Sequence, residues 1–131
     1  MASNRYAAAA EFRAELRRFL KQSEDCARAH GLTPRQHLLL LQIAAADGGQ
    51  TTVSQLVSTL ALTQSAVTEL VQRAESAGLV TRSPSKRDGR VALLSLTATG
   101  QERLDAVHDA LGAERAQLHR VVGSLGDDIH V

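Results

Sequence analysis

The sequence has 131 residues, 44% of them hydrophobic, which is enough for one compact domain with an ordinary core. Aromatic residues make up only 2%, which argues against a protein that stacks unpaired bases on aromatic rings. The net charge of +1 neither requires nor excludes nucleic acid, because affinity depends on where positive charge is concentrated.

A single cysteine, Cys26, excludes an intramolecular disulfide. No apolar run approaches the roughly 20 residues needed to cross a bilayer, and the Ala7–Ala10 stretch is too short for a secretory signal. We therefore expect a cytoplasmic protein without a membrane partner.

The first predicted helix covers residues 4–29, after a candidate N-cap at Ser3, and ends before Gly31. Its apolar residues recur at helical spacing, while charged residues take the opposite face. The apolar positions are Phe12, Leu16, Phe19, Leu20 and Cys26.

A second helix is predicted to begin after Thr33, with Pro34 in its first turn and Gln36 completing a capping box. Residues 37–46 are apolar nearly all round, so this helix should be the most buried of the domain. The glycines of residues 47–49 predict a turn.

Two shorter helices follow. Thr52 and Gln55 form a second capping box, Thr63 can cap the next helix, and Gly78 should end it. The pattern predicts a helix, a tight turn and a helix. Their inward residues should be Val53, Leu56, Val57 and Leu60 in the first, and Val67, Leu70, Val71 and Ala74 in the second.

Strand-like residues 79–82 and 90–96 flank a segment rich in turn residues, 83–89, which together predict a hairpin. Residues 82–90, a stretch of nine within this hairpin, carry four cations and one acid, which gives a net charge of +3. The cations are Arg82, Lys86, Arg87 and Arg90, and the acid is Asp88.

From Thr97 onward the pattern is again helical, and leucines recur every seven residues. These leucines and several valines form an apolar seam along one face of the helix, which Gly112 and Glu114 interrupt. This spacing indicates packing against another long helix, which we expect to be both the first helix and a partner copy. The seam residues are Leu104, Val107, Leu111, Leu118, Val121, Val122 and Leu125.

Several of these motifs resemble the MarR (multiple antibiotic resistance regulator) family of winged-helix repressors. The most specific are the Asp-x-Arg of residues 88–90 and the Leu-Thr-x-x-Gly that begins at Leu96. The other matching segments are residues 31–34, 63–68 and 77–80.

The resemblance implies a mainly α fold with a small β-hairpin, a winged helix-turn-helix that dimerises through long N- and C-terminal helices. We expect residues 1–131 to form a single domain, with residues 33–96 as the winged-helix DNA-binding lobe and residues 4–30 and 98–131 as the dimerisation region.

Two features depart from the family pattern. The turn between the paired helices carries Ala61 where glycine is common, so we expect its backbone to differ locally. The sequence ends about where the family has a final dimerising helix, and Gly123 and Gly126 should weaken any helix there. The dimer should then rely more on residues 4–29 and 98–122.

A helix that begins after Thr63 suits the major groove of DNA, where each base pair presents a distinct set of donors and acceptors. The competing interpretation is an ordinary solvated helix face, and Arg73 could equally pair with Glu69. The resemblance implies that Arg90 enters the minor groove and that Asp88 orients the wing. The predicted DNA-binding residues are Thr63, Gln64, Ser65, Thr68, Glu69, Gln72, Arg73, Lys86, Arg87, Asp88 and Arg90.

The expected partners are a second copy of the chain and double-stranded DNA with an inverted repeat, its half-sites about 10 base pairs apart. The family also implies a small-molecule effector in the cleft between the dimer region and the lobe. Candidate ligand-binding residues are Phe19, Cys26, His30 and His37.

Other functions compete with this interpretation. The same fold could serve as a protein-interaction module, or as a regulator that senses metal or redox state through its histidines or Cys26. His108 and His119 cannot share an ion, because eleven helical residues separate them by roughly 16 Å. No catalytic spacing or phosphate-binding loop stands out, so we expect neither an enzyme nor a cofactor.

Overall fold

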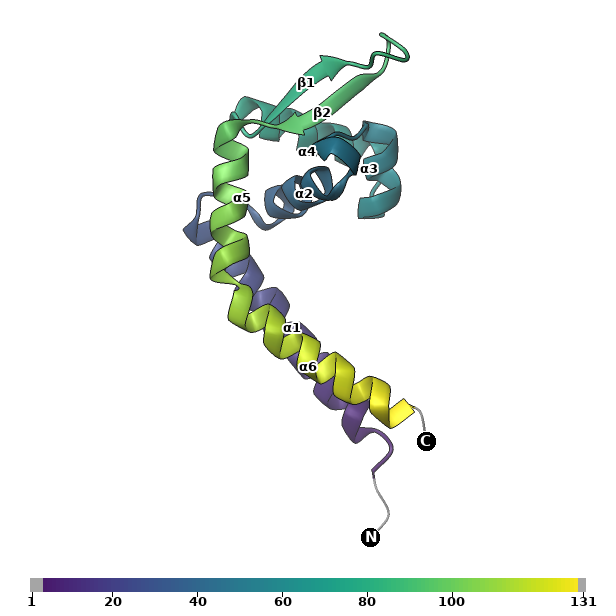
Figure 1. Cartoon of the computed structure of the whole chain (residues 1–131), viewed down its shortest axis with the longest axis vertical. Helices are drawn as coiled ribbons and strands as arrows, with labels where there is room; N and C mark the ends of the chain where they lie inside the picture. The colour runs from purple at the N-terminus through teal and green to yellow at the C-terminus, as the bar shows by residue number, and fades with distance from the viewer. Residues whose placement is uncertain (1–3, 130–131) are drawn as a thin grey trace.

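The computed structural model describes the backbone of residues 4–129 and the side chains of residues 4–124 (Figure 1). A lobe of short helices and one hairpin sits on an arm of two long antiparallel helices, with both termini at the far end of the arm. The mainly α architecture with a β-hairpin confirms the predicted fold class. Its elements are α1 (Ala7–Ala29), α2 (Pro34–Ala45), the 3-10 turn η1 (Asp47–Gly49), α3 (Val53–Leu60), α4 (Gln64–Ser76), β1 (Val80–Pro84), β2 (Ala92–Leu96), α5 (Ala98–Ala110) and α6 (Gly112–Ile129).

The helix α1 begins at Ala7, three residues later than predicted. Asn4 forms a turn instead: its Oδ1 accepts from the Tyr6 amide at 3.0 Å, and its carbonyl accepts from the Ala7 amide at 3.1 Å. An asparagine side chain that bonds nearby amides competes with helical bonding, which explains the later start. The predicted cap, Ser3, lies outside the described residues.

Side-chain caps start the next helices as predicted. At α2 and α3 both halves of the capping box form, between Thr33 and Gln36 and between Thr52 and Gln55. The Thr63 hydroxyl accepts from the third residue of α4 and fixes where that helix begins. Each cap satisfies an amide that has no partner inside its helix.

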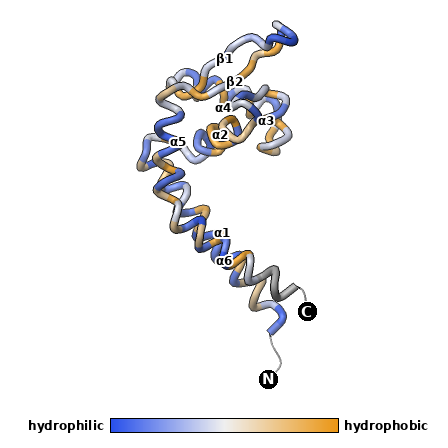
Figure 2. Tube along the Cα trace, viewed as in Figure 1, coloured by the Kyte–Doolittle hydropathy of each residue, from blue (hydrophilic) through white to orange (hydrophobic). Residues whose placement is uncertain are grey.

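The core lies inside the lobe, where apolar residues gather around α2 (Figure 2). The helix α2 is apolar nearly all round, but one of its faces is not covered, because Leu38 and Leu41 remain 50% and 39% exposed. Its packing partners α3, α4, α5 and β2 contact its other faces. The largest fully buried side chains are Leu39, Leu40, Ile43, Leu56, Val67, Val71, Leu79, Leu94 and Val107.

The turn between α3 and α4 holds Ala61 in the left-handed conformation, with φ 53° and ψ 42°. This is the conformation that glycine adopts without strain. Ala61 is the one residue other than glycine with positive φ among those the structure describes.

We expect Ala61→Gly to raise the free energy of unfolding by about 0.5 kcal/mol. Relief of left-handed strain, about 1 kcal/mol or more, exceeds the entropy that glycine gains in the unfolded chain. Urea denaturation measures the change. Ala14→Gly, at an exposed position inside α1, is the control and should lower stability by about 1 kcal/mol. A loss at both sites would contradict the strain.

The hairpin pairs β1 with β2 in antiparallel register, from Val80 opposite Leu96 to Pro84 opposite Ala92. The first strand therefore extends two residues past the predicted boundary. A further contact carries no signal in the sequence: Thr51 and Leu94 exchange two backbone hydrogen bonds of 3.1 and 2.8 Å. This bridge attaches the segment before α3 to the hairpin.

The C-terminal region forms two helices rather than the single one predicted, with a break at Leu111. The Arg115 guanidinium donates to the His108 carbonyl across this break at 2.7 Å. Beyond it, α6 packs along α1 and continues through Gly123 and Gly126 to Ile129, so these glycines do not end the helix. Leu104 and Leu111 are buried and Leu118 is half-buried, whereas the side chain of Leu125 lies outside the described residues.

In the part of the chain that the structure describes, none of the helices combines the length and apolar character that a membrane crossing requires.

Candidate nucleic-acid interface

The helix α4 is anchored on one face and open on the other. The four predicted inward residues, Val67, Leu70, Val71 and Ala74, are all buried. The opposite face carries the predicted DNA-reading residues, which periodicity alone places on one surface. Gln64, Ser65, Glu69, Gln72 and Arg73 are exposed, and Thr68 is half-buried.

Two charges on this face pair with each other. Arg73 Nη2 lies 2.7 Å from Glu69 Oε1, and both side chains are more than half exposed. Such an i,i+4 pair is weak and screened by salt, so the guanidinium can exchange this partner for another anion. The pairing of Arg73 with Glu69, which the sequence left open, therefore forms. Contact of Arg73 with DNA stays a prediction.

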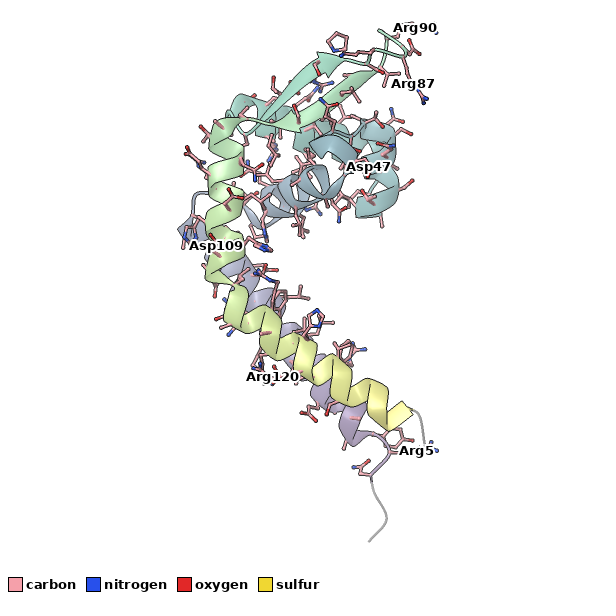
Figure 3. All side chains as sticks on the ribbon, viewed as in Figure 1. Arg5, Asp47, Arg87, Arg90, Asp109 and Arg120 are labelled. Carbon is pink, nitrogen blue, oxygen red and sulfur yellow. The ribbon has the colours of Figure 1, made fainter. Side chains whose placement is uncertain are left out.

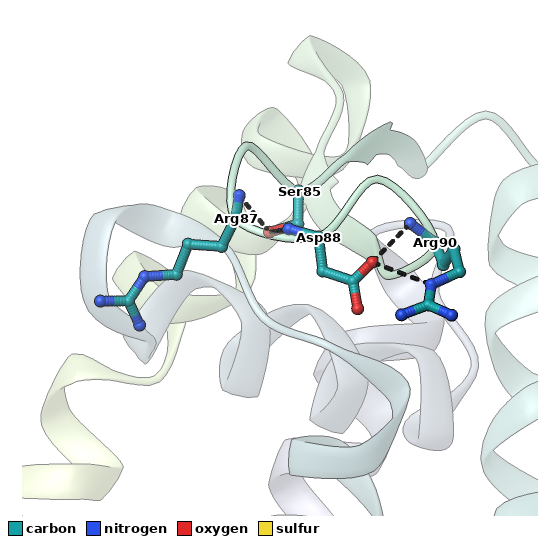
Figure 4. A network of polar contacts seen from close by, with 4 residues as sticks. All are labelled: Ser85, Arg87, Asp88 and Arg90. Atoms are coloured by element: carbon teal, nitrogen blue, oxygen red, sulfur yellow. Dashed lines mark hydrogen bonds and ion pairs between the residues drawn. The ribbon is translucent and has the colours of Figure 1, made fainter.

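The tip of the hairpin is organised by two side chains (Figure 4). Ser85 Oγ accepts from the amides of Arg87 and Asp88 at 3.2 and 3.5 Å. Asp88 Oδ1 accepts from the Arg90 amide at 3.0 Å and from its Nε at 3.3 Å. This geometry supports the expectation that Asp88 orients the wing and adds Ser85, which sequence analysis missed. The signal that could have found it is a serine inside a turn segment, because its hydroxyl can accept from backbone amides two or three residues later.

The four hairpin cations do not form one uniform patch. Arg82 Nε pairs with Glu75 Oε1 at 2.8 Å, so this arginine connects β1 to the end of α4. Lys86 and Arg87 are exposed, and the Arg90 side chain is 93% exposed despite its contact with Asp88. Figure 3 shows Arg87 and Arg90 at the outermost end of the hairpin. The cationic tip is therefore Lys86, Arg87 and Arg90.

The four predicted ligand-binding residues do not share one site. Cys26 Sγ lies 3.7 Å from His30 Nδ1 and 3.9 Å from the Val107 carbonyl oxygen. His37 is buried in α2. Phe19 lines a separate hollow between α1 and α6, which none of the other three residues lines.

Cys26 lacks the environment of a reactive thiol. Burial raises its pKa above the ordinary value, and the nearby negative charge of Glu114 raises it further. A sensing cysteine needs a lowered pKa, because the thiolate is the nucleophile. This environment does not favour redox sensing at Cys26. Within the described residues, no three His, Cys, Asp or Glu side chains are arranged to hold a metal ion.

His37 should make stability depend on pH. Burial lowers its pKa, and positive charge on His108 lowers it further. The unfolded chain then binds this proton more readily than the folded one, so stability should fall as pH drops below 6.5, the ordinary value. Urea midpoints measured between about pH 8 and pH 5 should decline less for His37→Gln than for the unchanged protein. Equal declines would show that His37 is not the cause.

The helices α2, α3 and α4, followed directly by the β1–β2 hairpin, form a winged helix-turn-helix domain. Comparison with known proteins agrees. Residues 30–91 match the model of the MarR family. No curated protein matches the sequence.

Solved structures of similar fold include the following. YusO from Bacillus subtilis is 25% identical over 88% of this chain and 78% of its own, with a TM-score of 0.63. A single-residue mutant of E. coli MarR complexed with operator DNA is 20% identical over 98% of this chain and 97% of its own, with a TM-score of 0.73. A single-residue mutant of S. aureus MepR bound to an oligodeoxyribonucleotide is 18% identical over 92% and 96%, with a TM-score of 0.69. Residues 30–91 thus resemble the MarR family of winged-helix regulators, and the fold agrees over most of the chain, as the sequence resemblance implied.

Proposed function

We propose that this chain is a dimeric transcription regulator that binds duplex DNA through α4 and the hairpin tip. One observation carries the proposal: the exposed polar face of α4 and the cationic tip of Lys86, Arg87 and Arg90 belong to the same lobe, with the hairpin at the end opposite the termini (Figure 1). The competing interpretation, in which the polar face of α4 is only solvated, does not account for a cationic hairpin on the same lobe.

Each part of this surface suits a different feature of DNA. Gln64 and Gln72 can pair with adenine and Glu69 can accept from cytosine, while Ser65 and Thr68 can bond either a base edge or a phosphate. Arg90 is assigned to the minor groove, where negative potential is concentrated. Lys86 and Arg87 are assigned to phosphates. The remaining contact residues of the proposal are Thr63, Arg73 and Asp88.

The similar structures support this choice of partner. The E. coli MarR mutant contains operator DNA, and the S. aureus MepR mutant is bound to an oligodeoxyribonucleotide. Both share the fold with this chain over more than nine-tenths of its length.

The arm offers the surface for a second copy. Leu20 on α1 is 50% exposed and Val122 on α6 is 46% exposed. Phe12 and Leu16 line a hollow with Leu20 on one side of α1. Exposed apolar residues of this kind on a projecting helix pair are typical of a dimer contact. Two-fold symmetry would place the α4 helices about one turn of DNA apart, so the operator would be an inverted repeat.

We further propose that the dimer is a ligand-responsive repressor. The candidate effector site is the junction of α1, α2 and α5, where Cys26 lies beside His30 and the Val107 carbonyl, and where His37 is buried. A ligand there would act only by favouring one spacing of the two lobes, because equal affinity for both spacings shifts nothing.

A selection from fragmented genomic DNA with the purified protein tests the DNA-binding proposal. Enriched fragments should share an inverted repeat with half-sites about 10 base pairs apart, and sedimentation of the complex should give two chains per repeat. Absence of any enriched sequence, or enrichment of a single unrepeated half-site by one chain, would refute it.

A further inference from the structure

The hairpin is anchored to the lobe near its base and projects beyond it (Figure 1). Val80, the first residue of β1, is buried, and the β1 residues that follow it are exposed. On β2, Leu94 is fully buried and exchanges backbone hydrogen bonds with Thr51. Arg82 stands opposite Leu94 in the hairpin register. This row is therefore a point where the hairpin meets the body of the lobe.

Arg82 connects this row to α4. Its Nε lies 2.8 Å from Oε1 of Glu75, in the last turn of α4, and the two side chains are 38% and 30% exposed. The other ion pair of α4, between Arg73 and Glu69, is 73% and 62% exposed. Partial burial reduces screening by water and salt, so the pair of Arg82 with Glu75 should be the more persistent of the two. It joins the two elements to which the proposed function assigns DNA contacts.

The position of the cationic tip depends on the tilt of the hairpin at this row. Lys86, the first residue of the tip, comes four residues after Arg82. At a strand rise of about 3.3 Å per residue, a tilt of about 10° at Arg82 would move the tip by roughly 2 Å. Binding contacts tolerate displacements of only about 0.5 Å, so a small tilt is enough to disturb them.

We propose that the ion pair of Glu75 with Arg82 fixes the angle between α4 and the hairpin, so that helix and tip reach the DNA together. Both are positioning residues: neither is assigned a contact with DNA. The inference rests on the proposed function and adds to it two residues outside the predicted contact set. Without the pair, the tip would still carry its charge, but Arg90 would not be held in register with the minor groove.

The affinity ratio of two DNA duplexes tests this role. Both carry the selected inverted repeat, and they differ only in the base pairs that flank the half-sites, all A·T in one and all G·C in the other. The unchanged protein should bind the A·T-flanked duplex at least about fivefold more tightly, because Arg90 is assigned to a narrow minor groove. Counterion release is the same for both duplexes, so a change in net charge cancels in this ratio.

Glu75→Ala should reduce the ratio to about twofold or less, because the tip is no longer held in place. Glu102→Ala removes the same charge from an exposed position on α5 and should keep the full ratio. Equal ratios in Glu75→Ala and Glu102→Ala, or no preference in the unchanged protein, would overturn the inference.

A double-mutant cycle shows whether the two residues act through each other. Arg82→Ala should reduce the ratio as much as Glu75→Ala does, and the double variant should lose no more than either single one. If Arg82 instead contacted DNA directly, only the variants that lack Arg82 would lose the preference. The single variants should melt within a few degrees of the unchanged protein, because both side chains are partly exposed. A large drop would show that the pair holds the fold rather than the hairpin, which contradicts the inference.

A measurement without DNA separates this inference from the proposed function. Spin labels are attached to Gln72→Cys on α4 and to Gly89→Cys, an open position in the hairpin loop, in a Cys26→Ser background. The distribution of distances between them should broaden or shift by roughly 2 Å or more when Glu75→Ala is added. Equal distributions would overturn the inference, whether or not the protein binds DNA. Failure of the unchanged protein to select any DNA would instead refute the proposed function, and with it any role of the pair in DNA binding.

Discussion

Gly100→Ala is expected to destabilise the protein by about 3 kcal/mol, the upper end of the range for overpacking. A Cβ atom at this position would lie 2.2 Å from the carbonyl oxygen of Leu79, well inside contact distance. The clash is with backbone that cannot move freely, because the Leu79 carbonyl accepts from the Thr97 amide at 3.0 Å and the Leu79 side chain is fully buried. The Thr97 hydroxyl also donates to the neighbouring Gly78 carbonyl at 2.5 Å.

Urea denaturation of Gly100→Ala and Gly123→Ala measures this effect against a matched control. Gly123 lies in α6, and a Cβ atom there would have nothing within 4 Å. Its replacement should therefore stabilise the helix by up to about 1 kcal/mol. If both variants shifted stability in the same direction and by similar amounts, the close approach of α5 to the hairpin base would not be what requires glycine at position 100.

The elements that sequence analysis predicted well are those fixed by local chemistry. A threonine hydroxyl three residues before the amide it caps is visible in the sequence, so the starts of α2, α3 and α4 could be predicted. The inward face of α4 was equally predictable, because the period of a helix determines it.

Contacts between distant segments could not be predicted in the same way. The bridge from Thr51 to Leu94 joins residues far apart in sequence, and neither residue carries a local signal for it. The pairing of Arg82 with Glu75 depends on how β1 lies against α4. Exposure of Leu38 likewise depends on which faces of α2 its neighbours cover, which hydropathy does not specify.

Part of the candidate site was predictable because local sequence determines it. The exposed polar face of α4 follows from one helix, and the position of the cationic tip follows from one turn. Two arginines of the candidate site pair with acids close to them in sequence, Arg73 with Glu69 and Arg90 with Asp88, so the sequence could suggest both pairs. The burial of Glu114 Oε2, which has no hydrogen-bond partner among the described side chains, was not predictable, because it results from the packing of α6 on α1.

Reversal of the wing charge should have the largest effect on DNA binding. In the variant Lys86→Glu, Arg87→Glu and Arg90→Glu, each hairpin tip carries three anions in place of three cations. Affinity should fall by at least about a thousandfold, enough to abolish a gel shift at physiological salt, because release of counterions from phosphates supplies much of the binding free energy. Any residual binding should also depend less on salt, its slope in log K against log salt smaller by about 3 per lobe, because fewer phosphates are neutralised.

A second triple variant separates local charge from net charge. Arg5→Glu, Arg28→Glu and Arg35→Glu make the same change in net charge at exposed positions outside the hairpin, with Arg5 near the far end of the arm (Figure 3). Since phosphate contacts act over about a Debye length, roughly 8 Å at physiological salt, this variant should retain most of its affinity. Both variants should keep the melting temperature within a few degrees, because all six side chains are exposed. Equal loss of binding in the two variants would mean that net charge rather than the wing attracts DNA, and retention of binding after wing reversal would remove the hairpin from the interface.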